Sequence, residues 1–200
     1  MTMELKYSAA LTGASFMLFE FKQIATLKEN GLSDDEIRHK VLTENLFQYE
    51  KLSSLKRGLP YILQRVNALD DYLRKYVLQE TLESSKLVNL YAIMKTDRLF
   101  FEFMSEVMQE KLSTHNYTLE KKDINSYFAI KSEQDTAVAS WSDSTVEKLQ
   151  SVFRKILYES GILTNYRTGE LNRLIVDEQI KNHLHAIGDG RYLQVIGESR

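Results

Sequence analysis

Apolar side chains are densest between residues 84 and 112, where they recur on every side of a helical wheel. Because a helix that is apolar nearly all round is usually buried, the pattern predicts a long central helix (84–112) in a compact helical bundle. A membrane span is the alternative. It is disfavoured because charged residues fall inside the stretch, and each would be costly at a bilayer centre: Lys95, Asp97, Arg98, Glu102 and Glu106.

Amphipathic patterns predict three helices before this stretch. The first, over residues 16–30, ends at Gly31, which suits the left-handed position after a helix. Ser33 and Glu36 form a capping box that starts the second helix, 33–44.

Ser53 or Ser54 is predicted to cap a third helix that runs to about Tyr76. Its apolar stripe is clearest over 54–69, and the opposite side is polar. Pro60, in the second turn, predicts a kink or a later helix start because proline lacks a backbone donor.

Residues 114–200 predict shorter elements. Asp123 is expected to cap one short helix, and residues 132–140 form another. Ser142 to Ser144 cap a helix that stops at Gly161. Residues 162–177 hold two apolar runs around a glycine-containing turn, which predicts a β-hairpin. Asp177 then caps a last helix.

The predicted fold class is therefore mostly α. It has an N-terminal part that resembles a helix-turn-helix and a small C-terminal β-hairpin that resembles a wing. We expect subdomains over residues 1–80 and 81–200, or a single compact domain that contains both.

The amino-acid composition excludes several kinds of chemistry. One proline and eight glycines in 200 residues favour long helices, and the absence of cysteine excludes disulfides, thiolate nucleophiles and cysteine-bound zinc. That absence, with an N-terminus unlike a signal peptide, suits a cytoplasmic protein. The net charge is −2, so nucleic-acid binding would need a local basic patch.

One such patch is predicted on the helix-turn-helix-like part. Residues 51–75 hold six basic and two acidic side chains, although the seven-residue connection before the third helix is longer than a usual tight turn. An ordinary solvated helix face is the alternative. Cations and amides are the groups that meet phosphates and base edges, so we predict contacts with double-stranded DNA from Lys51, Lys56, Arg57, Gln64, Arg65 and Asn67.

A second, weaker patch follows from the last long helix and the hairpin. Its cations are Arg154, Lys155, Arg167 and Arg173. Between residues 146 and 175 there are five basic and three acidic side chains, and a hairpin that merely covers the core explains them equally well.

Other candidate chemistry has structural explanations. We predict that Asp97 and Arg98, inside an apolar helix, form a structural ion pair, because buried charges are usually paired. Asp177, Glu178 and Lys181 faintly resemble a nuclease site, but a helix cap followed by a solvated face explains them as well. We expect no catalytic residue, metal or cofactor.

Six strings, taken in order, resemble the BrxA family of BREX (bacteriophage exclusion) phage-defence systems. They are Tyr7–Phe16, Glu44–Tyr49, Leu52–Arg57, Lys95–Phe103, Trp141–Thr145 and Glu159–Leu163. The resemblance implies a cytoplasmic, mostly helical, non-enzymatic accessory protein that binds double-stranded DNA. It also implies work beside a methyltransferase, an ATPase and a phosphatase-like protein. The alternative is an assembly adaptor without DNA binding of its own, with an interface on the exposed faces of helices 16–30 and 144–160.

Overall fold

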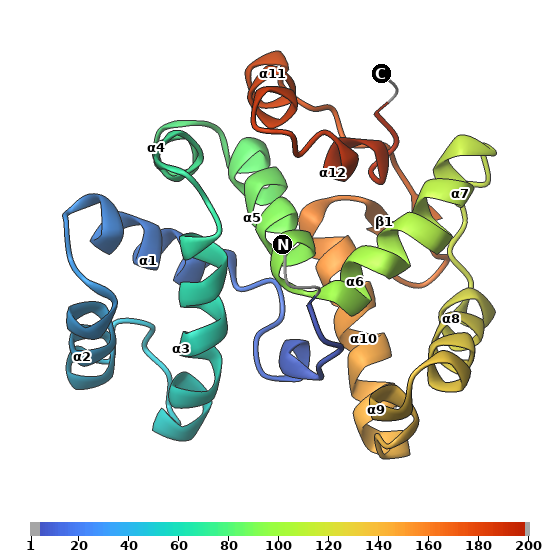
Figure 1. Ribbon diagram of the computed structural model, residues 1–200, viewed down its shortest axis with the longest axis horizontal. Helices are drawn as coiled ribbons and strands as arrows, with labels where there is room; N and C mark the ends of the chain where they lie inside the picture. The colour runs from blue at the N-terminus through green and yellow to red at the C-terminus, as the bar shows by residue number, and fades with distance from the viewer. Residues whose placement is uncertain (1–4, 199–200) are drawn as a thin grey trace. The chain divides into compact units, whose positions relative to one another are not determined.

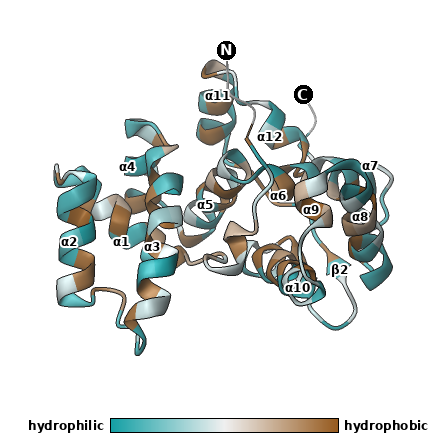
Figure 2. Cartoon of the chain, turned by 60° about the horizontal axis from the view of Figure 1, so that its bottom comes forward, coloured by the Kyte–Doolittle hydropathy of each residue, from teal (hydrophilic) through white to brown (hydrophobic). Residues whose placement is uncertain are grey.

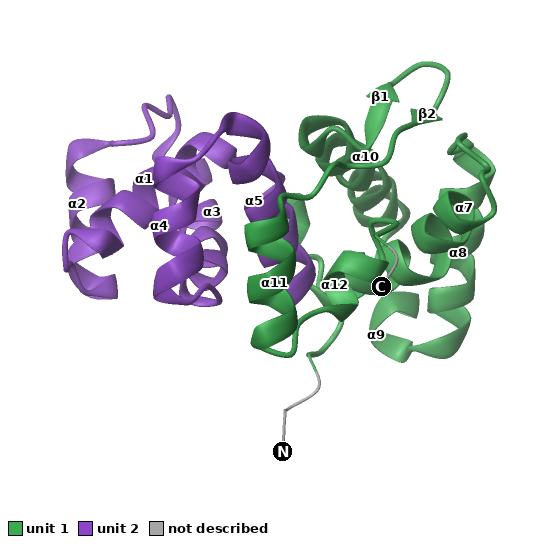
Figure 3. Ribbon diagram, turned by 90° about the horizontal axis from the view of Figure 1, so that it is seen from above, with its two compact units in different colours: residues 1–12, 97–200 green, residues 13–96 purple. Residues whose placement is uncertain are grey.

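The computed structural model describes residues 5–198. It is predominantly α-helical with one short antiparallel strand pair, which confirms the predicted fold class (Figure 1). The chain forms two compact units, residues 13–96 and residues 1–12 with 97–200 (Figure 3).

The unit of residues 13–96 is a small helical bundle. Its helices are α1 (Leu18–Glu29), α2 (Asp34–Glu44), α3 (Leu52–Asn67), α4 (Asp71–Gln79) and α5 (Leu82–Thr96). Helix α1 packs against the other four, and α2 and α3 carry both hydrophilic and hydrophobic residues along their length (Figure 2). Phe21, Ile24, Ile62 and Leu90 are fully buried, so the apolar stripes read from the sequence form this core.

The local signals around α2 are confirmed. The Glu36 N–H donates to Ser33 Oγ at 3.3 Å, and the Ser33 N–H donates to Glu36 Oε2 at 2.8 Å, so the capping box is complete. Gly31 has φ +85°, the left-handed conformation expected after the first helix.

The third helix differs from its prediction at both ends. Helix α3 begins at Leu52 and runs through Pro60, so a later start is wrong. It ends at Asn67 rather than near Tyr76. Asp70 begins α4 separately, because its carboxylate accepts the Leu73 N–H at 2.9 Å and takes the place of a helical carbonyl.

The predicted single helix over 84–112 is wrong in one respect, because the chain breaks at Asp97. Helix α5 ends at Thr96, and Asp97 is extended with φ −126° and ψ 109°. Its carboxylate accepts the Phe100 N–H at 2.8 Å and thereby caps α6 (Arg98–Phe103). The break coincides with the boundary between the two units.

The unit of residues 1–12 and 97–200 holds the remaining elements. They are a 3₁₀ turn η1 (Ala10–Thr12), α6, a π-helical turn η2 (Met104–Met108), α7 (Gln109–Ser113), α8 (Lys121–Gln134), α9 (Thr136–Ala139), α10 (Asp143–Ser160), β1 (Leu163–Asn165), β2 (Glu170–Leu171), α11 (Glu178–Ala186) and α12 (Arg191–Gln194). Phe153 of α10 is central to the aromatic core, with ring centroids 5.0 Å from Phe100 and 5.3 Å from both Phe103 and Phe128.

Two helices in this unit start at residues other than those predicted. Asp123 is not the cap of α8 but its third residue, and its carboxylate accepts the Glu120 N–H at 2.7 Å. The predicted helix over 132–140 is instead the end of α8 followed by α9, because the Asp135 side chain caps a new start. The caps predicted for α10 at Ser142 and for α11 at Asp177 are confirmed.

The predicted hairpin is confirmed. Strands β1 and β2 pair antiparallel, with Leu163 opposite Leu171. Gly169 has φ +77°, and its carbonyl accepts the Leu119 N–H at 2.8 Å. This bond holds the hairpin against the segment before α8.

Candidate nucleic-acid-binding surfaces

The predicted patch on α3 retains four accessible polar side chains. Lys51, Lys56, Arg57 and Gln64 are exposed. Arg57 and Gln64 recur at helical spacing and share one side of α3. Within residues 5–198, no carboxylate lies within ion-pair distance of Lys51, Lys56 or Arg57. Their charges are therefore available to a partner outside the chain.

Arg65 was assigned wrongly to this patch. Its side chain is only 2% exposed, and its guanidinium donates to the Ser15 carbonyl at 2.6 Å, to the Phe16 carbonyl at 3.4 Å and to the Ala14 carbonyl. A buried guanidinium needs such acceptors to offset its desolvation. Arg65 therefore fixes residues 14–16 against α3 and is inaccessible to a phosphate.

Asn67 joins α3 to α2. Its amide donates to Asp34 Oδ2 at 2.8 Å, so the end of α3 lies beside the start of α2. The hydrogen bond from Lys28, helped by that from Asn67, holds the pKa of the Asp34 carboxyl below its ordinary value against the opposing effect of burial. A groove contact by Asn67 remains a prediction, because part of its bonding capacity serves this helix junction.

The second patch lies where α10 meets the hairpin. Lys155 and Arg167 are exposed, and neither forms an ion pair with the rest of the described chain. The Arg154 guanidinium lies 4.5 Å from the centroid of the Tyr166 ring and donates to the Tyr166 carbonyl. Tyr158 packs edge-on against the same ring, at a centroid distance of 5.8 Å. Arg154 is thus held in one orientation while it remains only half-buried.

Arg173 has a structural contact. Its guanidinium donates to the Leu112 carbonyl at 2.6 Å and lies 6.0 Å from the Tyr117 ring centroid. It connects the chain after the hairpin to the end of α7. A DNA contact by Arg173 remains a prediction.

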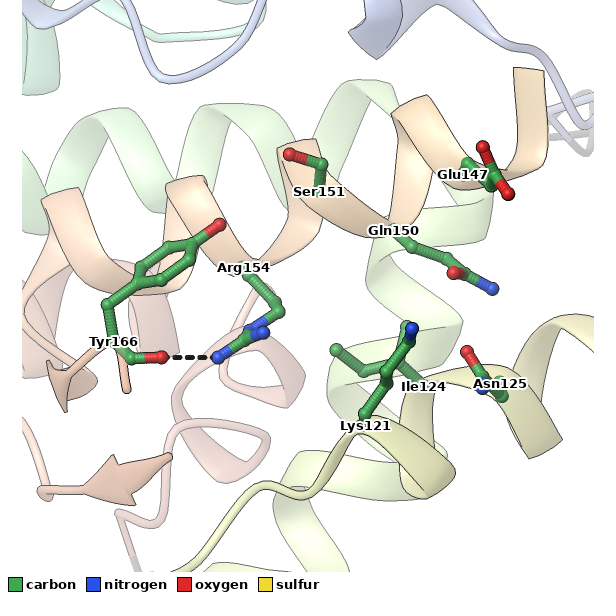
Figure 4. Close-up of a pocket in the computed structure, with 8 residues that line it drawn as sticks. All are labelled: Lys121, Ile124, Asn125, Glu147, Gln150, Ser151, Arg154 and Tyr166. Carbon is green, nitrogen blue, oxygen red and sulfur yellow. Dashed lines mark hydrogen bonds between the residues drawn. The ribbon is translucent and has the colours of Figure 1, made fainter. Parts of the chain in front are cut away.

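Arg154 also lines a cavity of about 280 Å³ between α8, α10 and the hairpin. Its lining residues are Lys121, Ile124, Asn125, Glu147, Gln150, Ser151, Arg154 and Tyr166. Figure 4 shows Lys121 extending from α8 towards α10, and the Arg154 guanidinium turned towards Tyr166. The α10 members could have been found by their spacing of three and four residues. The α8 members could not, because only tertiary packing brings them opposite α10.

The charges around Asp97 and Arg98 belong to a structural network. Arg98 pairs with Glu102 at 2.7 Å, and Lys131 pairs with both Glu102 and Glu106 at 2.6 Å. The Tyr7 hydroxyl donates to Glu102 at 2.6 Å. The carboxylate of Asp97 caps α6, and its pairing with Arg98 remains a prediction.

The acidic residues before α11 have local partners. Asp177 caps α11, and Lys181 pairs with Glu178 at 3.2 Å and with Glu198 at 2.8 Å. Among the residues that the structure describes, no group of three or more histidine or acidic side chains is arranged to hold a metal ion. Nor does any helix of residues 5–198 have the length and apolar character needed to cross a membrane.

The structure places the chain in the class of predominantly α-helical proteins, and exposed cations lie on its helices α3 and α10. The model of the BrxA family matches residues 5–188, and the chain therefore belongs to the BrxA family. A relative from Bacillus cereus (strain H3081.97), named BREX protein BrxA, is 37% identical over 98% of each chain. One of the same name from Paramagnetospirillum magneticum (strain ATCC 700264 / AMB-1) is 25% identical over 90% of this chain and 91% of its own.

The crystal structure of an uncharacterized protein from Magnetospirillum magneticum has a similar fold. Its TM-score is 0.83 at 24% sequence identity, over 96% of this chain and 98% of the other. This likeness supports the fold across both units.

Proposed function

We propose that this protein is a non-enzymatic, cytoplasmic accessory component of a BREX phage-defence system that binds double-stranded DNA with little sequence specificity. The BREX assignment draws on the family and on the names of its relatives. Partners from the same system would include the methyltransferase, the ATPase and the phosphatase-like protein.

The observation that carries the DNA proposal is the exposed, unpaired basic side of α3. Lys51, Lys56 and Arg57 lie at the start of the helix, and the exposed amide of Gln64 follows about two turns further along. Cations without a carboxylate partner can neutralise backbone phosphates, and this contact carries no sequence information. A protein of net charge −2 would use such a patch rather than its overall charge.

The direct test is to measure the affinity of a labelled duplex for the unchanged protein and for Lys56→Glu with Arg57→Glu. We expect the double variant to weaken binding at least tenfold, by the order of magnitude of two lost phosphate contacts. The matched control is Arg38→Glu with Lys40→Glu on α2, which changes net charge equally at cations that already pair with Asp35 and Glu44. Equal losses in the two variants would remove α3 from the DNA site.

An assembly adaptor without DNA binding is the second candidate. Phe19, on the predicted interface helix α1, is 53% exposed, and Tyr158 of α10 is 50% exposed. Large exposed aromatic side chains are common at protein interfaces. Nuclease-resistant co-purification with other components of the system, from a chain that has no affinity for duplex, would favour the adaptor.

A further inference from the structure

The cavity between α8, α10 and the hairpin has a lining that favours an anion. Lys121 of α8 is exposed and forms no ion pair within the described residues. Arg154, on the opposite wall, is oriented by the ring and carbonyl of Tyr166. Glu147 is the single carboxylate among the lining residues, so two cations face one anion.

The neutral lining residues suit a phosphate ester attached to a sugar. Asn125, Gln150 and Ser151 bring amide and hydroxyl donors, which can bond phosphate or sugar oxygens. The Arg154 guanidinium keeps donors beyond the one used on Tyr166, and a planar fork binds phosphate oxygens in pairs.

The volume of the cavity limits the size of the ligand that it can hold. A volume of about 280 Å³ lies at the lower edge of small-molecule sites, which begin at roughly 300 Å³. One phosphate with its sugar is of suitable size for such a cavity. Residues 147, 150, 151 and 154 also share one side of α10, so the cavity continues along the polar side of the helix that precedes the hairpin.

We propose that this cavity binds a backbone phosphodiester, with its deoxyribose, of double-stranded DNA. Lys121 and Arg154 hold the phosphate oxygens, and Gln150 and Asn125 contact the sugar side. The inference rests on the proposed DNA binding, and it adds Lys121, Asn125 and Gln150 to the interface. The shared chemistry is that of a phosphate ester, which a free nucleotide would also supply.

The test is a duplex titration of the full chain and its Lys121→Gln variant. Lys121 is exposed and forms no ion pair in the described chain, so this substitution leaves the fold intact. We expect about tenfold weaker binding at low salt, and a plot of log affinity against log salt that is less steep by about one. The matched control is Lys148→Gln, which removes the same charge from an exposed residue of α10 outside the cavity, with a loss below about threefold.

Two further variants make the assignment sharper. Glu147→Gln removes the only lining carboxylate, and we expect it to strengthen duplex binding about threefold. Arg154→Lys keeps the charge but loses the paired donors, and we expect weaker binding with an unchanged salt slope.

The outcomes separate the two proposals. Absence of duplex binding by the unchanged protein at low salt overturns both. Binding by the unchanged protein with equal losses in Lys121→Gln and Lys148→Gln overturns the cavity assignment and leaves DNA binding standing. Binding of thymidine monophosphate that Lys121→Gln weakens, together with a duplex affinity that Lys121→Gln leaves unchanged, would assign the cavity to a free nucleotide and contradict the proposal.

Discussion

The guanidinium of Arg65 is buried, although arginine is a residue type that is mostly exposed. Its position on the α3 wheel is about 40° from Leu69, at the edge of the apolar stripe. An arginine there can turn inward if acceptors meet it, and the carbonyls of residues 14–16 do so. Those carbonyls come from a segment 50 residues earlier, so the sequence of α3 could not reveal them.

Replacement of Arg65 by methionine should destabilise the protein strongly. The substitution leaves buried carbonyl oxygens without their donors, each costing about 1–3 kcal/mol. We expect a loss of at least about 3 kcal/mol in the free energy of unfolding, measured by urea denaturation. Arg57→Met, at an exposed position of the same helix, should change stability by less than about 0.5 kcal/mol. A stability loss no larger than that of the control would contradict the buried role.

At the scale of elements, Glu102 connects α6 to α8 and to the N-terminal segment. Burial would raise the pKa of the Glu102 carboxyl, but hydrogen bonds from Lys131, Tyr7 and Arg98 outweigh it and hold the pKa below the ordinary value of 4.5. A lowered pKa in the folded state means that the network contributes stability above pH 4.5 and loses it as pH falls through the lowered value.

We therefore expect Glu102→Gln to flatten the acid side of the stability profile. The free energy of unfolding of the unchanged protein should fall more steeply than that of the variant as pH drops below about 4.5. Glu133→Gln, at an exposed residue of α8 that has no ion-pair partner within residues 5–198, provides the control. Parallel profiles for the unchanged protein and Glu102→Gln would contradict this role.

The hairpin depends on close backbone contact at Gly169. A Cβ atom there would lie 2.1 Å from the Leu119 carbonyl oxygen, whereas one at Gly188 would meet nothing within 4 Å. Both residues have a left-handed φ, so alanine costs about 1–2 kcal/mol at either position. We expect Gly169→Ala to cost roughly 1–3 kcal/mol more than Gly188→Ala in thermal or urea unfolding, because only the former forces the hairpin from Leu119. Equal costs would contradict this packing.

Local sequence signals predicted helix ends best where the capping residue and the group it caps lie in one short segment. The Ser33–Glu36 box, the Ser142 cap and the glycine after α10 are all of this kind. Prediction of a continuous helix failed where a polar side chain interrupts an apolar pattern, as at Asp97. Helical periodicity continues across that residue, so the choice between a buried charge and a cap depends on the tertiary environment.

At the scale of the whole molecule, the family was identified from the order and number of the six sequence segments that resemble it. Several of these segments have structural roles in the fold. Residues 14–16 of the first segment are held by Arg65 and Asn89, and Asp97 of the fourth is a helix cap. The exposed cations of α3 were predictable because a wheel separates them from the core. The cavity beside α10 was not, since its two walls are distant in sequence.

The salt dependence of duplex affinity tests the central claim most directly. The proposed phosphate contacts are Lys51, Lys56 and Arg57 in one unit and Lys121, Arg154, Lys155 and Arg167 in the other, all exposed or half-buried. At about −0.9 per neutralised phosphate, the slope of log affinity against log salt should be on the order of −3 or steeper. No binding at low salt, or an affinity unchanged by salt, would contradict the account.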